Sequence, residues 1–176
     1  MSIQDSVFLS CKAAGIVVGR VGTASVSVED LQNLERSSSN KLSPIRQKIV
    51  ANTAVASTIE FYKKQGKKIV FTNGCFDLLH AGHVRYLEQA SALGDVLVVA
   101  VNSDDSVTRL KGESRPINAL RDRMELLAGL ASVDLVVDFS DDTPEDLICV
   151  IKPDILVKGG DYQVDQIAGR QCAGEV

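Results

Sequence analysis

Apolar and polar segments alternate between residues 67 and 157 in a way that predicts several buried strands. Residues 96–101 (VLVVAV) contain no polar side chain, which is typical of a parallel strand covered on both faces. Three further short runs are rich in β-branched or aromatic residues and have the length of buried strands. They are residues 68–72, 134–139 and 154–157.

The segments between these runs carry helical signals. Residues 83–93 and 119–131 repeat apolar side chains every three or four positions, and Asn118 is placed to cap the second helix. Thr143 and Pro144 are typical of the start of another helix. Strand and helix alternate four times, so we predict a Rossmann-like doubly wound α/β domain with a parallel sheet. The inward-facing helical residues would be Val84, Leu87, Ala90, Leu93, Leu120, Met124, Leu127 and Leu130.

The preceding part of the chain differs in character. Residues 36–41 are polar and predict a linker. Residues 45–65 predict a single helix that begins after Pro44 and ends at Gly66. We therefore assign residues 36–66 to a linker and helix, and residues 67–176 to the α/β domain.

Composition narrows the class of protein further. An apolar fraction of 45% and a charged fraction of 24% are ordinary for a soluble globular chain, and neither a membrane span nor a secretory signal is visible. Cys11, Cys75, Cys149 and Cys172 form no C-x-x-C pair, which predicts a reducing cytoplasm and thiols rather than disulfides. The net charge of −4 argues weakly against nucleic acid or a membrane surface as the main partner.

The predicted sheet indicates where a ligand would bind. Ligands of open α/β sheets lie beyond the carboxyl ends of the strands, where residues 73–83, 102–116 and 158–162 are expected. The first of these segments delivers His80 and His83, the only two histidines of the chain, to the start of a helix. Free amides and the helix dipole favour phosphate there, and Gly82 permits close approach of a ligand.

Two imidazoles at such a position could stabilise the negative charge that develops on a phosphate during group transfer. Such a transfer needs no covalent intermediate. The alternative is a metal site formed by His80, His83, Cys75 and Asp77. The usual zinc spacings are missing from the sequence. We therefore favour phosphate chemistry.

The string G-C-F-D-L-L-H-A-G-H, which ends at His83, resembles the signature of the H-x-G-H nucleotidyltransferases, the cytidylyltransferase-like superfamily. Residues 99–117 (VAVNSDDSVTRLKGESRPI) and 156–162 (LVKGGDY) resemble the nucleotidyltransferase domain of bifunctional heptose kinase/adenylyltransferases. The resemblance covers about residues 67–170. It implies transfer of AMP from ATP, with Mg²⁺, to D-glycero-β-D-manno-heptose 1-phosphate, giving ADP-heptose and pyrophosphate for lipopolysaccharide core synthesis.

Two other functions remain open at this point. A cytidylyltransferase acting on glycerol phosphate or a similar phospho-alcohol would share the same signature. A non-catalytic nucleotide-binding fragment is the other alternative, because the chain ends before the S-T-T-x-I-type motif with which the family continues. We expect a domain truncated at both ends, and an exposed edge strand would then favour a homodimer.

The resemblance also implies roles for individual residues. The catalytic residues would be His80, His83 and Lys111. The nucleotide would be bound by Thr72, Asn73, Gly74, Cys75, Phe76, Asp77, Gly82, Arg123, Lys158, Gly159, Gly160 and Asp161. The phosphorylated sugar would be bound by Asn102, Ser103, Asp104 and Arg115.

Each role has a structural alternative. Asp77 could form a turn without touching a ligand, and Asp161 could lie in a plain turn. Lys111, Arg115 and Arg123 could be solvated surface residues, and so could Arg121, which precedes Arg123 on the same predicted helix.

The first 35 residues contain a segment, residues 13–27 (AAGIVVGRVGTASVS), that resembles the closing helix and strand of a ribokinase-like sugar kinase. Its glycines Gly15, Gly19 and Gly22 lack the G-x-G-x-x-G spacing of a dinucleotide loop. The kinase's anion hole and catalytic aspartate are missing from the sequence. We therefore assign residues 1–35 to a kinase remnant without kinase activity.

Overall fold

The computed structural model describes residues 44–159 and 167–175, together with Ser10, Ala14, Val26, Ser27 and Asp30. The chain divides into two compact units, Met1–Ser43 and Pro44–Val176. The predicted kinase remnant and linker lie almost entirely outside the described residues. The second unit contains the α/β domain.

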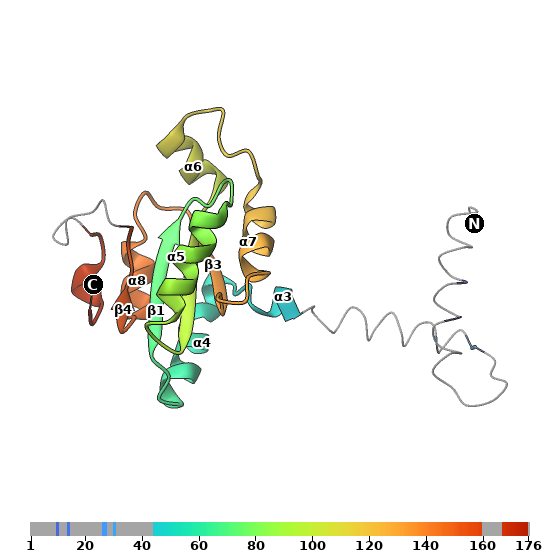
Figure 1. Ribbon diagram of the computed structural model, residues 1–176, viewed down its shortest axis with the longest axis horizontal. Coiled ribbons are helices and arrows are strands. Elements are labelled where there is room, and N and C mark those ends of the chain that lie inside the picture. Colours follow the sequence, from blue (N-terminus) through green and yellow to red (C-terminus); the bar gives the residue numbers. More distant parts are fainter. Residues whose placement is uncertain are drawn as a thin grey trace. The chain divides into compact units, whose positions relative to one another are not determined.

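The second unit is built on a parallel sheet of four strands in the order β3-β2-β1-β4 (Figure 1). The strands are β1 (Ile69–Gly74), β2 (Val96–Asn102), β3 (Leu135–Phe139) and β4 (Ile155–Leu156). All three strand pairings are parallel. The predicted α/β class and all four predicted strands are confirmed.

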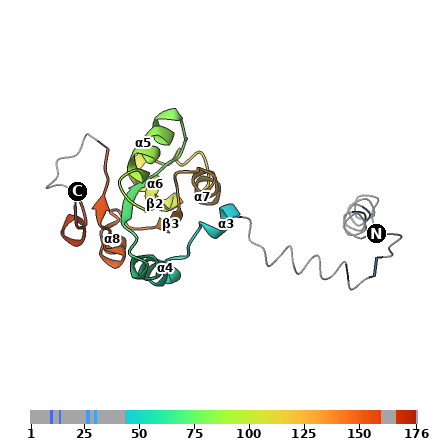
Figure 2. The ribbon, with the colours of Figure 1, turned by 60° about the horizontal axis from the view of Figure 1, so that its bottom comes forward.

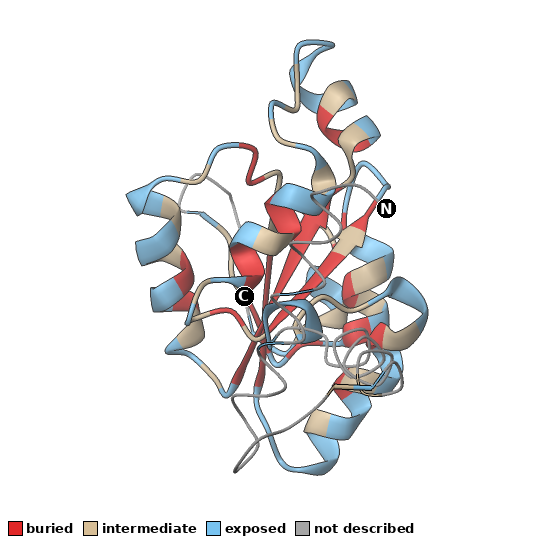
Figure 3. Cartoon of the chain, turned by 90° about the vertical axis from the view of Figure 1, so that its right-hand side faces the viewer, coloured by how far each residue is buried: buried red, intermediate tan, exposed pale blue. Residues whose placement is uncertain are grey.

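Helices cover both faces of this sheet (Figure 2). On one face, α4 (Asn52–Lys64) and α8 (Glu145–Ile151) pack against the strands, and on the other α5 (Ala81–Ser91) and α7 (Leu120–Ala128) do so. The inner sides of these helices and the strands between them are buried, while the outer sides are exposed (Figure 3). This is the doubly wound arrangement that the sequence predicts.

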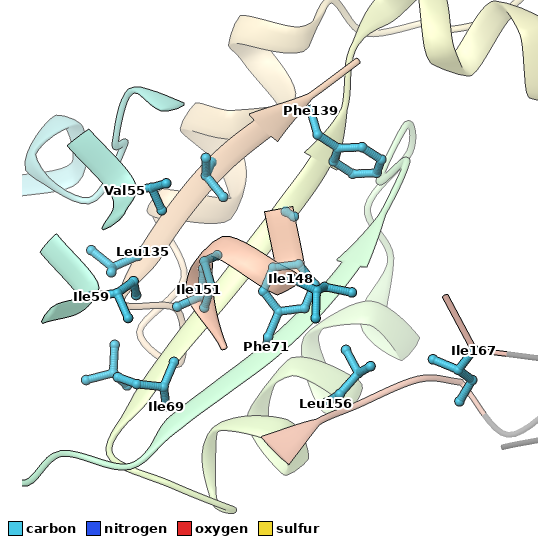
Figure 4. Packing of buried hydrophobic residues seen from close by; sticks show 14 residues of the cluster. Val55, Ile59, Ile69, Phe71, Leu135, Phe139, Ile148, Ile151, Leu156 and Ile167 are labelled. Carbon is cyan, nitrogen blue, oxygen red and sulfur yellow. The ribbon is translucent and has the colours of Figure 1, made fainter. Parts of the chain in front are cut away.

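Side chains of β2 alternate between two hydrophobic cores, because successive residues of a strand point to opposite faces. Val96, Val98 and Ala100 belong to the core beneath α4 and α8, which also holds Phe71 and Ile148 (Figure 4). The neighbouring β2 residues at positions 97, 99 and 101 belong to the core beneath α5 and α7. Burial on both sides explains why β2 has no polar residue before its end.

Several predicted helix details are wrong. The expected single helix at residues 45–65 is divided into α3 (Pro44–Gln47) and α4, because Ile49 leaves the helical path to form a parallel bridge with Val136. Residues 104–111 form an additional helix, α6 (Asp104–Lys111). Val84 and Leu93 of the predicted inner face are exposed.

The predicted caps differ as well. Helix α7 begins after Ala119, which makes no side-chain cap, and α8 begins after Pro144 rather than after Thr143. Asn118, the expected cap of α7, instead donates its side-chain amide to the carbonyl oxygen of Asp77 at 2.7 Å. A tertiary hydrogen bond has thus taken the place of a local one.

The expectation that the cysteines stay reduced is wrong for one pair. Cys149 of α8 and Cys172 of η2 (Arg170–Cys172) form a disulfide across 23 positions of sequence. The chain returns to the sheet after residue 166, and Glu175 forms a parallel bridge with Ile155 of β4, which brings Cys172 against α8. Spacing in the sequence cannot show such a return. Cys75 is a free thiol.

Among the described residues, no helix combines the length and the apolar character needed to cross a membrane.

Candidate active site

A cavity of about 890 Å³ lies at the carboxyl end of β1, where Asn73 and Gly74 line it. It lies beside the histidine loop, residues 75–80, which joins β1 to α5. Ten residues predicted from the sequence line it: Asn73, Gly74, Cys75, Phe76, Asp77, His80, His83, Lys111, Arg115 and Gly159. Three lining residues were not predicted: Leu78, Tyr86 and Ser114.

His80 is fixed at the start of α5 by its own ring. It is the N-cap residue, with extended backbone, and its Nδ1 accepts a hydrogen bond of 3.1 Å from the amide of Gly82. A nitrogen that accepts carries no proton, so the proton of the neutral ring lies on Nε2. A Cβ on residue 82 would come within 2.8 Å of the His80 ring. Gly82 is therefore needed for this geometry.

His83 lies one helical turn further on, with its ring centroid 4.0 Å from that of His80. Burial is the main cause that lowers the pKa of His83, and the nearby charges of His80 and Lys111 lower it further. The neutral form of His83 is thereby favoured. A neutral imidazole can still donate one hydrogen bond to a phosphate oxygen.

Asp77 ties the histidine loop to the segment that follows α6. Its buried carboxylate accepts hydrogen bonds from the Arg115 guanidinium at 2.6 Å and from the backbone amides of Ile117 and Asn118 at 2.7 and 3.1 Å. Burial by itself would raise the pKa of Asp77, but these bonds, with that from Arg115 the strongest, hold it below its ordinary value. Asp77 thus holds the loop, as the resemblance implies.

Arg123 is buried completely, so the alternative of a surface role is wrong for it. Its guanidinium donates to the carbonyl oxygens of Cys75 at 2.6 Å and Asn118 at 2.9 Å, and to the carboxylate of Asp104 at 2.7 Å. These bonds use the donors of Arg123 inside the protein, and Arg123 does not line the cavity. Arg121, by contrast, is exposed and pairs with Glu125.

The predicted sugar-binding residues at the end of β2 have partners within the protein. Asn102 is buried and donates to the hydroxyl of Ser106, and the hydroxyl of Ser103 caps α6 by accepting from the Ser106 amide. Asp104 pairs with Arg123. Helix α6 was not predicted from the sequence, and for this reason these residues were expected to be free for a ligand.

Lys111 and Arg115 are the two cations of the cavity lining. Lys111 is the last residue of α6 rather than part of a loop, and it is followed by Gly112, whose φ is +93°. Lys111 and His83 both line this cavity, and the positive charge of Lys111 contributes to the lowered pKa of His83. Arg115 is partly exposed despite its bond to Asp77.

Thr72 and Tyr86 link the sheet to α5. Thr72 is buried and its hydroxyl lies 2.7 Å from the Tyr86 hydroxyl, which donates to the carbonyl oxygen of Val157. Tyr86 stands one turn after His83, and that spacing was the one signal that could have identified it. Thr72 supports the strand rather than lining the cavity.

A second cavity of about 360 Å³ adjoins the first and shares Asn73, Gly74, Cys75 and Gly159 with it. Lys158 lines this second cavity and donates a short hydrogen bond to the side chain of Asn73. Burial lowers the pKa of Lys158 to about 8. Gly160 and Asp161, predicted to contact the nucleotide, lie outside the described residues.

In the described part of the chain, no group of three or more histidine, cysteine, aspartate or glutamate side chains is placed to hold a metal ion.

Residues 71–172 match the family model described as cytidylyltransferase-like, which is more than half of the chain. The chain belongs to this family. A solved structure described as the lipopolysaccharide core biosynthesis protein of Thermoplasma volcanium GSS1 is similar, with 36% identity and a TM-score of 0.50, covering 56% of this chain and 79% of that one.

Two curated relatives carry the name Bifunctional protein HldE. The protein of Sulfurimonas denitrificans is 50% identical over 175 residues, which cover 99% of this chain and 36% of the relative. That of Haemophilus influenzae strain PittGG is 55% identical over 168 residues, which cover 96% and 34%. The chain therefore spans about a third of the length of these relatives.

Proposed function

We propose that this chain is an adenylyltransferase that transfers AMP from ATP to D-glycero-β-D-manno-heptose 1-phosphate, forming ADP-heptose and pyrophosphate. The observation that carries the proposal is the pair His80 and His83, which stand at the N-terminus of α5 beside a cavity that also contains Lys111 and Arg115. The similarity to HldE proteins and to a lipopolysaccharide core biosynthesis protein supports this choice of substrate.

In this reaction an oxygen of the acceptor phosphate attacks the α-phosphorus of ATP. The bond from that phosphorus to the oxygen bridging to the β-phosphate breaks, and pyrophosphate leaves with that oxygen. His80, through Nε2, and His83 donate hydrogen bonds to the non-bridging oxygens on which negative charge develops. Lys111 and Arg115 offset the charge of the phosphates, so positioning and electrostatics carry the catalysis.

Asp77 is the only carboxylate in the described lining of the first cavity, so a magnesium ion would have to arrive with the nucleotide. Mg²⁺ is commonly held by one or two carboxylates together with substrate phosphates, and Asp77 already accepts three hydrogen bonds. Mg²⁺ would supply charge neutralisation to the triphosphate. Phosphate oxygens would provide most of its ligands.

Two further expectations accompany this proposal. We propose that the chain acts in the cytoplasm, where its nucleotide substrate is found, and that it forms a homodimer. Gel filtration with light scattering tests the second point, and a monomeric mass at working concentration would contradict it.

The test is pyrophosphate release with Mg²⁺, heptose 1-phosphate and either ATP or CTP. We expect turnover with ATP that falls at least about 100-fold in His80→Ala, because one donor to the developing charge is lost. Arg121→Ala is the matched control, since Arg121 is exposed and lies outside the cavity lining. Turnover with CTP but not with ATP would show that the nucleotide substrate is CTP, which contradicts the choice of ATP. A folded chain without turnover would contradict the proposal for this chain.

A further inference from the structure

Phe76 has a backbone conformation that bulky residues seldom adopt. Its φ is +46°, in the left-handed region, where a residue with a large side chain is an outlier. Such strain persists only where surrounding contacts fix it. The side chain of Phe76 is 7% exposed and packs into the core beneath α5 and α7. The strained loop thus places one aromatic ring firmly in the core.

That ring contacts His83. The two ring centroids are 5.5 Å apart and the planes meet at 65°, an edge-to-face contact of the kind that aromatic rings favour. The position of the Phe76 ring also depends on Gly74, because a Cβ on residue 74 would lie 3.1 Å from the Phe76 ring. Phe76 therefore packs against one side of His83, and Gly74 leaves the space that the Phe76 ring occupies.

His83 lacks the hydrogen bond that commonly orients a functional imidazole. Its Nδ1 is buried and has no hydrogen-bond partner in the described part of the chain, whereas Nδ1 of His80 accepts from Gly82. Buried N–H groups without an acceptor are rarer in proteins than under-satisfied acceptors. In the neutral ring a proton on Nε2 is therefore favoured over one on the unpartnered Nδ1, and packing has to supply the orientation.

We propose that the side chain of Phe76 is the positioning residue of His83, which it holds by edge-to-face packing in the neutral tautomer protonated on Nε2. The sequence resemblance implied only a place for Phe76 in the backbone cradle of the nucleotide. The catalytic meaning of this inference rests on the proposed function. The test of the inference does not depend on that function, because the tautomer and the titration midpoint of an imidazole can be measured without turnover.

The test is ¹⁵N NMR of the imidazole groups in the 176-residue chain, which has only two histidines. In Phe76→Leu we expect the tautomer-sensitive ¹⁵N shifts of His83 to change and its titration midpoint to rise toward the ordinary value. Phe139→Leu is the matched control, since Phe139 is 5% exposed and packs in the core on the other face of the sheet. In this control we expect the His83 signals of the parent chain.

Unchanged His83 shifts and an unchanged midpoint in a folded Phe76→Leu chain would overturn the proposal. If that variant fails to fold, Gly74→Ala asks the same question, because the added methyl displaces the Phe76 ring without removing it. Phe76→Tyr keeps the ring and should restore the parent signals. Where turnover is present, we expect kcat to fall roughly 10- to 100-fold in Phe76→Leu, with KM for ATP nearly unchanged.

Discussion

Arg123 donates a hydrogen bond of 2.6 Å to the carbonyl oxygen of Cys75, although 48 positions separate the two residues. The same guanidinium holds the carbonyl oxygen of Asn118, just before α7, and the carboxylate of Asp104, at the start of α6. One buried cation thus fixes three segments that surround the candidate active site. The histidine loop owes its position partly to a residue that no ligand needs to touch.

We expect Arg123→Met to lower the free energy of unfolding by about 2–4 kcal/mol, because two carbonyl oxygens lose their donor and a carboxylate loses its partner. Urea unfolding measures this. Arg121→Met, at an exposed position of the same helix, should change stability by no more than about 0.5 kcal/mol. Equal losses in the two variants would contradict the anchoring role of Arg123.

Gly82→Ala should damage catalysis far more than stability. The new Cβ would lie 2.8 Å from Cε1 and 2.9 Å from Nδ1 of His80, so the ring must leave its place. We expect kcat/KM for pyrophosphate release to fall roughly 10- to 100-fold, since small displacements of reacting groups have effects of this size. Stability should change by about 1 kcal/mol at most, because the helical gain of alanine offsets the lost cap.

Gly129→Ala is the control for this variant. Gly129 ends α7 with a right-handed helical backbone, and an added Cβ would meet only backbone oxygens at 3.3 Å or more. Activity close to that of the parent chain is expected. If Gly82→Ala retained the same activity as Gly129→Ala, the contact between Gly82 and His80 would have no catalytic importance.

The sequence predicted the strands and the edge at which the site lies, because both follow from local patterns. The run at residues 96–101 has the length and the β-branched content that are typical of a buried strand. Parallel strands then bring their carboxyl ends to one edge, which placed His80, His83 and Lys111 around one cavity.

The features that the sequence did not predict depend on contacts between distant segments. Arg123 resembles any arginine of a helix surface until its partners at Cys75 and Asp104 are known. Ile49 breaks a helical pattern because it pairs with β3. Helix α6 had local signals, with the Ser103 cap, two aspartates in its first turn and basic residues in its last, but it has only two turns and two large apolar residues, Val107 and Leu110.

Acid should destabilise the chain through His83. Because burial, together with the charges of His80 and Lys111, lowers the pKa of His83 in the folded state from 6.5, the unfolded chain binds this proton more readily. The free energy of unfolding therefore decreases as the pH falls from about 6.5 to below the lowered pKa of His83. Asp77, whose pKa is lowered from 3.8, loses its contribution only at lower pH.

Urea unfolding at about pH 5 and about pH 7 measures this dependence. In His83→Gln the difference between the two pH values should shrink, because the variant cannot take up the proton. An equal difference in the parent chain and the variant would show that His83 does not couple folding to protonation in this range.

Nucleotide binding near pH 8 should be accompanied by proton uptake at Lys158. Burial lowers the pKa of Lys158 to about 8, so about half of the chains carry a neutral amine at that pH. An anionic triphosphate bound beside Lys158 favours the charged form, and binding should therefore take up as much as about half a proton. Calorimetric titration with Mg²⁺-ATP in two buffers of different ionisation enthalpy measures the uptake.

Lys158→Met should bind nucleotide without this uptake, whereas Lys64→Met should retain it, since Lys64 is an exposed residue paired with Glu60 on α4. The comparison of Lys158→Met with Lys64→Met shows whether Lys158 takes up the proton and therefore whether the triphosphate binds beside it. Lys158 lines the second cavity and the histidines line the first, and Asn73, Gly74 and Cys75 line both. Uptake that persists in Lys158→Met would mean that another group takes up the proton, and no uptake in the parent chain would mean that the phosphates stay beyond the electrostatic reach of Lys158.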